Sequence, residues 1–376
     1  MSSMPTPHHA DAALAAELFG GPTGQPATPY SVAGSAGGDA GRCRQCGEAL
    51  IEGARYCEAC GLDLSHAVPA RIAHSHDAPP ACDGCGGTSF DPQPDGGVYC
   101  ANCGVRRPSG RASATADLGP VAAASDVGRR HHHNEDGFGL VALEHTYAAV
   151  VCDGVSSSSR PDTASHAAAE AAAGAFLRIL DAADGEPDAA LAEVAMIAAA
   201  GAAQAAAAES GGHGDRNRPG GMPNPPSTTF VAGVVTPDAI TVGWVGDSRA
   251  YWIGDGGESA CLTVDDTLAG QLTAAGVEVS EDAPNVNALI RWLGADATDT
   301  SPHVRAFRPE GSGRVIVCSD GLYRYASEAA ALADITPTGS AIDVARHLVA
   351  YALEAGGGDN VTVTVLPYSP REGQAR

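Results

Sequence analysis

Residues 315–321 read Val-Ile-Val-Cys-Ser-Asp-Gly, an apolar run that ends in an acidic residue followed by glycine. The same arrangement occurs at residues 147–154, Tyr-Ala-Ala-Val-Val-Cys-Asp-Gly. Short apolar runs rich in valine and isoleucine predict strands, and an Asp-Gly pair is typical of the turn that ends one. Asp320 and Asp153 are therefore expected at the ends of strands, where the sheet fixes each carboxylate at its rim.

Two further acidic residues occupy comparable positions. Asp136 ends the run His-His-His-Asn-Glu-Asp just before an apolar stretch, and Asp359 follows three glycines and precedes a strand-like stretch. Hard divalent cations prefer oxygen ligands, and two such cations about 3.5–4 Å apart are a common device for cleaving phosphate esters. The four acids together predict a site for two metal ions. Each acid alone has an ordinary alternative, because Asp is also a common turn residue.

The motifs around these acids resemble those of protein phosphatase 2C, the metal-dependent (PPM-type) serine/threonine phosphatases. The resemblance extends from Val121 to Pro367 and rests on several motifs in the family's order. They are Ser125-Asp126 with Asn134-Glu135-Asp136, Cys152-Asp153-Gly154, Ser227-Thr228-Thr229, Gly246-Asp247-Ser248-Arg249, Leu293-Gly294, Cys318-Ser319-Asp320-Gly321 and Gly358-Asp359-Asn360.

The resemblance implies an α+β fold, a four-layer α/β/β/α sandwich of two antiparallel sheets flanked by helices. It also implies hydrolysis of phosphoserine or phosphothreonine in a phosphoprotein substrate, with two Mn²⁺ or Mg²⁺ ions as cofactors. By this resemblance Asp153 would bridge the ions, and the Gly154 carbonyl would bind one of them. Asp320 and Asp359 would hold the other ion, and Asp136 would hold water at the metals.

The sequence departs from the family pattern at several positions. His131 stands where relatives usually carry an arginine that grips the phosphate, and Ser156-Ser157 replaces a usual glycine pair. Arg324 stands where relatives often carry an acid that binds a third metal together with the equivalent of Asp247. A guanidinium would repel a cation. We therefore expect two ions and a structural capping role for Asp247.

These departures leave a second function open, a phosphatase-like module that binds a phosphoprotein or another partner without turnover. His131 is nevertheless expected to be a catalytic residue. Arg249 could pair with an internal carboxylate or contact substrate. The histidines at residues 131–133 could be a metal site, although consecutive side chains of an extended chain point to alternate faces.

Eight of the 11 cysteines form four C-x-x-C pairs near the N-terminus. Four thiolates at tetrahedral spacing make a closed structural zinc site, and such short segments depend on the metal for folding. The spacing predicts two zinc ribbons with two structural Zn²⁺ ions, and disulfides or a redox pair are the alternatives. The zinc ligands would be Cys43, Cys46, Cys57 and Cys60 in one ribbon and Cys82, Cys85, Cys100 and Cys103 in the other.

Composition limits the partners. The chain has 376 residues with 45 acids and 22 bases, and its net charge of −23 argues against nucleic acid as the main partner. The ribbons are more suited to a protein partner. No apolar run is long enough to span a membrane and no signal segment is visible. Reduced thiols and metal-type cysteine pairs indicate the cytoplasm. The remaining cysteines, Cys152, Cys261 and Cys318, are expected to be buried as small apolar residues.

The domain organisation follows from these patterns. We expect a disordered segment at residues 1–40, zinc ribbons at 41–65 and 80–105, a linker at 106–118, a phosphatase 2C-like catalytic domain at 119–368 and a tail at 369–376. Apolar periodicity predicts strands at 121–127, 137–143, 146–152, 228–235, 239–246, 249–253, 303–308, 314–319 and 361–367. Helices are predicted at 161–181, 188–209, 266–276 and 339–356.

Overall fold

The computed structural model describes part of the chain, and all of that part belongs to the second of two units, His66–Arg376. The first predicted zinc ribbon, residues 1–40, and Cys82 and Cys85 of the second ribbon lie outside the described residues. The described residues are 71–75, 89–92, 98–104, 113–181, 194, 197, 201, 224–277, 279 and 285–370.

The first of two six-stranded sheets contains the two strands that carry Asp136 and Asp153. Every pair of neighbouring strands in it is antiparallel. Its order is β1 (Arg71–His74), β6 (Asp136–Ala142), β7 (Tyr147–Asp153), β9 (Phe230–Val235), β10 (Ile240–Val245) and β14 (His303–Phe307).

The second sheet is also antiparallel throughout and contains the strands that lead to or follow the other two acids. Its order is β12 (Ser259–Cys261), β11 (Arg249–Gly254), β15 (Gly313–Cys318), β16 (Val361–Tyr368), β5 (Ala122–Asp126) and β4 (Ser113–Asp117). Two small pairings complete the strands, β8 (Ser227–Thr228) with β13 (Leu293–Gly294), and β2 (Phe90–Pro92) with β3 (Val98–Cys100).

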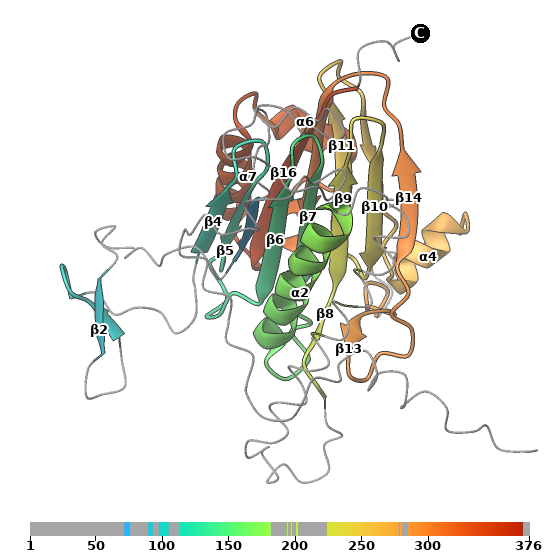
Figure 1. Ribbon diagram of the computed structural model, residues 1–376. Helices are drawn as coiled ribbons and strands as arrows, with labels where there is room; N and C mark the ends of the chain where they lie inside the picture. Colours follow the sequence, from blue (N-terminus) through green and yellow to red (C-terminus); the bar gives the residue numbers. More distant parts are fainter. Residues whose placement is uncertain are drawn as a thin grey trace, which may run out of the picture. The chain divides into compact units, whose positions relative to one another are not determined.

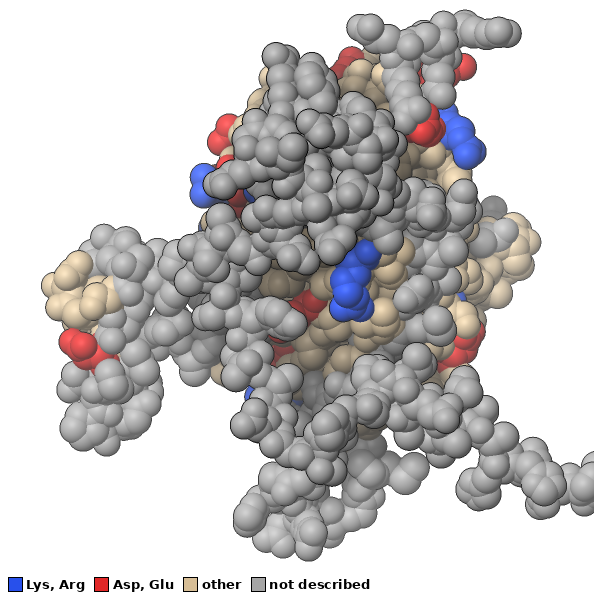
Figure 2. Space-filling model, viewed as in Figure 1, with Lys and Arg blue, Asp and Glu red and all other residues tan. Residues whose placement is uncertain are grey.

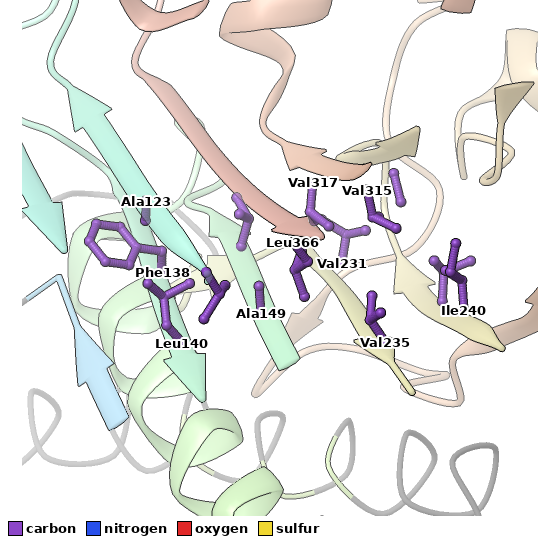
Figure 3. Close-up of a cluster of buried hydrophobic side chains, with 14 of the residues drawn as sticks. Ala123, Phe138, Leu140, Ala149, Val231, Val235, Ile240, Val315, Val317 and Leu366 are labelled. Atoms are coloured by element: carbon purple, nitrogen blue, oxygen red, sulfur yellow. The ribbon is translucent and has the colours of Figure 1, made fainter. Parts of the chain in front are cut away.

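The two sheets pack face to face over a core of buried aliphatic and aromatic side chains. Phe138 and Leu140 of one sheet and Val317 and Leu366 of the other belong to the same cluster, and Figure 3 shows side chains from both sheets converging there. Alternate residues of a strand point to opposite faces, so Val141 belongs instead to the cluster beneath the helix on the outer face. Strands buried on both faces explain the nearly continuous apolar runs in the sequence.

Helices cover the outer face of each sheet (Figure 1). Helix α2 (Pro161–Asp181) packs on β6 and β7, and helix α7 (Ala341–Ala355) packs on β5 and β16. Glycines on β6 let α2 approach closely, because a Cβ at Gly139 would lie 2.6 Å from the Cβ of Ala173. The shorter helices are α4 (Leu268–Ala274), α5 (Asp320–Tyr323) and α6 (Ala329–Ile335).

The expected sandwich of two antiparallel sheets flanked by helices is confirmed. The predicted linker at 106–118 is wrong in its second half, because residues Ser113–Asp117 form β4 and pair with β5. Strand β1, between the predicted ribbons, was also not expected, and it pairs with β6. Both are short edge strands: β4 pairs with β5, the next strand along the chain, whereas β1 pairs with β6, which lies far away in the sequence. Among the described residues no helix has the length and apolar character needed to cross a bilayer.

We predict that the core between the sheets dominates the stability of this unit. Phe138 is fully buried there, so Phe138→Ala should lower the free energy of unfolding by about 3–5 kcal/mol. Val304→Ala is the control, because Val304 is 37% exposed on β14 and its truncation should cost under about 1 kcal/mol. Urea denaturation measures both, and equal losses would contradict this account of the core.

Candidate active site

The four predicted acids come from both sheets and meet at one end of the sandwich. Asp136 and Asp153 lie directly opposite each other in the ladder between β6 and β7. Asp320 begins α5 directly after β15, and Asp359 lies just before β16. Asp153, Asp320 and Asp359 line an open cavity of about 480 Å³, together with Gly154 and Asp247. Asp136 lies behind them and is 1% exposed.

Buried hydrogen bonds tie the first sheet to the second beneath this cavity. The Ser319 hydroxyl, at the end of β15, donates to Asp136 Oδ2 at 2.8 Å and accepts from the Thr362 amide at 2.9 Å. The Thr362 and Ser125 hydroxyls are 2.7 Å apart, and Asn134 donates to Ser125 at 2.8 Å. The chain of bonds therefore fixes Asp136 relative to β15, which precedes Asp320, and to β16, which follows Asp359.

Asn360 attaches the loop before β6 to the start of β16. Its amide nitrogen donates to the carbonyls of Val127 and His133, and its Oδ1 accepts from the Glu135 amide at 2.8 Å. This side chain therefore sets the separation between Asp136, which follows Glu135, and Asp359, which precedes Asn360. The sequence motif contained Asn360, but nothing in the sequence showed that it clasps this loop.

The motif Cys152-Asp153-Gly154 is also held by hydrogen bonds, which involve Thr229. The Thr229 hydroxyl accepts a hydrogen bond from the Asp153 amide at 2.9 Å, and the Thr229 amide donates to the Asp153 carbonyl at 2.7 Å. The Gly154 amide donates to the Glu135 carbonyl, and a Cβ at Gly154 would lie 2.8 Å from that oxygen. Ser156, one of the departures from the family, donates to Glu135 Oε2 at 2.7 Å and so joins the same cluster.

Burial and mutual repulsion act together on these carboxyl groups. Burial raises the pKa of Asp136 to about 7, and the charges of Asp320 and Asp359 add to the increase. The pKa of Asp153 is raised well above its usual value, first by burial and then by the charge of Asp136. Burial, followed by the charge of Asp359, also raises the pKa of Asp320. The acidic side chains thus lie where positive charge would stabilise their ionised forms.

Two cationic or potentially cationic side chains contact these acids. Arg324 donates from one guanidinium nitrogen to Asp320 Oδ2 at 2.7 Å and to Asp359 Oδ2 at 3.1 Å. His131 places Nε2 3.1 Å from Asp359 Oδ1. The predicted catalytic position of His131 is therefore at the site, but its contact in the structure is a carboxylate.

The donor set fits hard divalent cations, although its geometry is not closed around one. The buried Oδ1 of Asp136 accepts no hydrogen bond within the described part of the chain, and carboxylate oxygens are the ligands that such cations prefer. Among the described residues, however, no three acidic, histidine or cysteine side chains form a ready-made ion site. Metal binding would have to draw the carboxylates together and move the Arg324 guanidinium aside.

The motif Gly246-Asp247-Ser248-Arg249 contains an arginine that is not among the residues lining the cavity. Arg249 pairs with Asp265 through two hydrogen bonds of 2.8 Å. Of the two roles expected for Arg249, the structure therefore shows the pairing with an internal carboxylate. Its guanidinium lies 3.9 Å from the centre of the Tyr323 ring, and Tyr323 donates to the Asp247 carbonyl. Burial raises the pKa of Asp247 to about 7, helped by the charges of Asp320 and Asp265. Its capping role stays a prediction.

The cysteines of this domain divide as follows. Cys152 and Cys318 are buried as expected, and burial raises the pKa of each thiol. Cys261 is only half-buried, on edge strand β12, so its expected burial is wrong. Cys100 is buried at the end of β3, and Cys103 is exposed in the turn that follows.

Sequence reasoning missed the apolar side of the cavity. Leu289 and Trp292 line it together with the acids, from the segment between α4 and β14. The Trp292 indole donates to Asp296 at 2.9 Å. This segment has little regular structure and few apolar residues in register, so only the folded chain brings it to the site.

Comparison with known proteins identifies the fold and the motifs together. A family model described as protein phosphatase 2C matches residues 127–351, more than half of the chain. The chain belongs to the protein phosphatase 2C family. The matched residues include Asp136, Asp153 and Asp320, and Asp359 lies just beyond them.

Two curated relatives and one solved structure illustrate the similarity. A serine/threonine phosphatase stp of Listeria welshimeri is 28% identical over 254 residues, which are 64% of this chain and 93% of that protein. Serine/threonine protein phosphatase PstP of Mycobacterium tuberculosis is 31% identical over 141 residues, 37% of this chain and 27% of PstP. The matches to several curated relatives span between a quarter and little more than half of their length.

The solved structure is that of the PPM Ser-Thr phosphatase MsPP from Mycobacterium smegmatis in complex with cacodylate. It is 27% identical, has a TM-score of 0.50, and the match covers 66% of this chain and 98% of that one. The phosphatase 2C domain of this chain therefore corresponds to nearly the whole of MsPP.

We predict that close packing at Gly321 is needed to hold Asp320 and Asp359 in place. A Cβ at Gly321 would lie 1.9 Å from the Asn360 carbonyl oxygen, so Gly321→Ala should destabilise the fold by about 1–3 kcal/mol or more. Gly174→Ala in helix α2 is the control, because its Cβ would meet no atom within 4 Å. This substitution should raise the free energy of unfolding by about 0.5–1 kcal/mol. Thermal denaturation of both variants distinguishes these opposite signs, and a neutral Gly321→Ala would disprove the close packing.

Proposed function

We propose that this chain hydrolyses phosphoserine and phosphothreonine in proteins, with two Mn²⁺ or Mg²⁺ ions as cofactors. The observation that carries the proposal is the convergence of family acids from both sheets on one open cavity. Family membership supports the reaction class, and the curated names of the relatives supply the phosphoprotein class of substrate.

The residues divide into ligands and supports. Asp153, with the Gly154 carbonyl, and the pair Asp320 and Asp359 would hold the ions, and Asp136 would orient water beside them. When bound, the ions would supply an acidified water and positive charge for the phosphoryl oxygens. Ser319 keeps one oxygen of Asp136 occupied by a hydrogen bond, so the second oxygen is the one that can accept from water.

His131 would contribute to phosphate binding in place of the family's arginine. It lies within 3.1 Å of Asp359 Oδ1, so it borders the ligands. An imidazole is a full cation only when protonated, and its grip on phosphate should be weaker than that of an arginine at neutral pH.

The alternative function is binding of a phosphoprotein without turnover. One observation favours it, since Arg324 already occupies oxygens of Asp320 and Asp359. Measurement of Mn²⁺-dependent hydrolysis of a phosphothreonine peptide by the full chain decides between the two. Binding of the peptide with no release of phosphate at any Mn²⁺ concentration would establish the alternative.

The ligand roles lead to a mutational prediction. Asp153→Asn and Asp320→Asn should each reduce Mn²⁺-dependent phosphate release by more than about a hundredfold, the upper range for residues that only support a metal ligand. Asp255→Asn, in an exposed turn, removes the same charge and should leave the rate unchanged. Phosphate release from the peptide measures all three, and turnover preserved in either ligand variant would refute the proposed site.

We further propose that the four N-terminal C-x-x-C pairs hold two structural Zn²⁺ ions and that the ribbons dock a protein partner. Support comes from the cysteine spacing and from the turn after the last pair. In that turn the Gly104 amide donates to the Cys100 carbonyl, and Gly104 has a φ of +73° that favours glycine. A cytoplasmic location remains part of this proposal, because these thiolates need a reducing compartment.

The zinc proposal predicts the metal content of the chain. Elemental analysis should find two zinc ions per chain, and the double variant Cys43→Ser, Cys46→Ser should retain one. Mn²⁺-dependent turnover of that variant should stay near the parent value, because its cysteines precede the residues of the phosphatase 2C match in the sequence. Absence of zinc in a protein purified without chelators would favour the disulfide or redox alternatives.

A further inference from the structure

We infer that Arg324 is a built-in competitor for the metal ions: its guanidinium holds Asp320 and Asp359 together and must leave before an ion can bind both. This inference rests on the proposed metal site. It adds a residue that sets the concentration of divalent cation at which the site fills.

The geometry of Arg324 matches a bridging counter-ion. A single guanidinium nitrogen lies 2.7 Å from Asp320 Oδ2 and 3.1 Å from Asp359 Oδ2. The two acids come from different parts of the second sheet, so this nitrogen joins the end of β15 to the start of β16. A cation shared by one oxygen from each of two carboxylates is the arrangement that an ion at this place would also require.

The oxygens of Asp359 are already divided among partners. Oδ1 is 3.1 Å from His131 and accepts from the Asn360 amide at 3.0 Å. Oδ2 is the atom that Arg324 contacts. An ion that binds Asp359 through Oδ2 therefore meets Arg324 directly, whereas the Oδ1 contacts can persist.

The arginine is anchored by its backbone and free to move at its tip. Its amide donates to the Asp320 carbonyl at 2.9 Å at the end of the short helix α5. Its side chain is 49% exposed, whereas those of Asp320 and Asp359 are 24% and 25% exposed. The guanidinium thus approaches the acids from the solvent side and can turn back to solvent without disturbing the core.

The chemistry makes occupation by ion and arginine mutually exclusive. Arginine stays charged at any physiological pH and offers donors only, so it cannot ligate a cation. Two positive charges on the same carboxylate oxygens repel, and the bonds to Arg324 must be given up when an ion binds. Since the side chain is half-exposed, we expect these bonds to weaken ion binding by a modest factor of about 3–10.

The test measures ion affinity and stability separately from turnover. Isothermal titration calorimetry gives the Kd for Mn²⁺ in the full chain, and thermal denaturation in chelator gives the Tm without ions. Arg324→Ala should bind Mn²⁺ about 3–10-fold more tightly, yet melt at a lower temperature in chelator. Saturating Mn²⁺ should abolish that difference in Tm.

Two variants act as controls. Arg324→Lys keeps the charge on a flexible stem and should give a Kd between those of the parent and Arg324→Ala. Arg346→Ala removes one positive charge from an exposed position of α7 and should change neither the Kd nor the Tm in chelator by a comparable amount. Equal tightening in Arg346→Ala would mean that only the net charge matters, which would overturn the inference.

The outcomes separate this inference from the proposed function. If the parent binds Mn²⁺ and releases phosphate, but Arg324→Ala binds Mn²⁺ equally or more weakly, only the inference fails. If neither the parent nor Arg324→Ala binds Mn²⁺, the metal-dependent function fails and the inference with it. Binding by Arg324→Ala alone would be the strongest support, because the arginine would then block the site by itself.

Discussion

Four carboxylates are held close together in a largely buried place, where their negative charges repel one another. The rest of the site depends on how this repulsion is offset. Burial disfavours the ionised form of an acid, and a neighbouring negative charge disfavours it further. Both effects raise the pKa values of Asp136, Asp153 and Asp320. A protein gains nothing in stability from such a cluster unless positive charge is bound there. The cluster is therefore better explained by ligand binding than by folding.

The two sheets supply the rigidity that this repulsion requires. The acids would move apart if each were carried by an independent loop. Instead, Asp136 and Asp153 face each other across one ladder, and Ser319 and Thr362 bond that ladder to the second sheet. The hydrophobic core between the sheets then fixes the distance between the strands that carry all four side chains. The apolar interior, seen in Figure 3, and the acidic rim are thus parts of one arrangement.

The described surface carries both acidic and basic side chains. On the face shown in Figure 2, the described acidic and basic side chains are scattered and in places adjacent, without a continuous basic area among them. A strongly acidic chain that binds a phosphorylated substrate needs a local source of positive charge. The acids at the cavity would provide a place for the proposed cations, which when bound would reverse the sign of the local field.

The sequence predicted most of the strands, and the positions of the acids next to them, because strands and turns have local signals. Apolar runs that end in Asp-Gly reveal a strand and its end, as at Asp153 and Asp320, and motif order did the rest. Edge strand β4 was missed because Ser113–Asp117 contains no apolar run, although its partner β5 is the next strand along the chain. Edge strand β1 was missed because it becomes a strand only through β6, a partner distant in sequence. The side-chain bonds of Asn360 were missed for the same reason. Such contacts join segments that the sequence places hundreds of residues apart.

The position of Arg324 one helical turn after Asp320 determines which side chains it contacts. In the sequence it stands four positions after Asp320, where an acid would add one more negative charge to the cluster. Helix α5 begins at Asp320, and residues four apart lie on the same face of a helix. That turn brings the guanidinium back onto Asp320, and the tight approach of Gly321 to Asn360 brings Asp359 within its reach. The residue expected only to exclude a third ion thus contacts the ligands proposed for the first two.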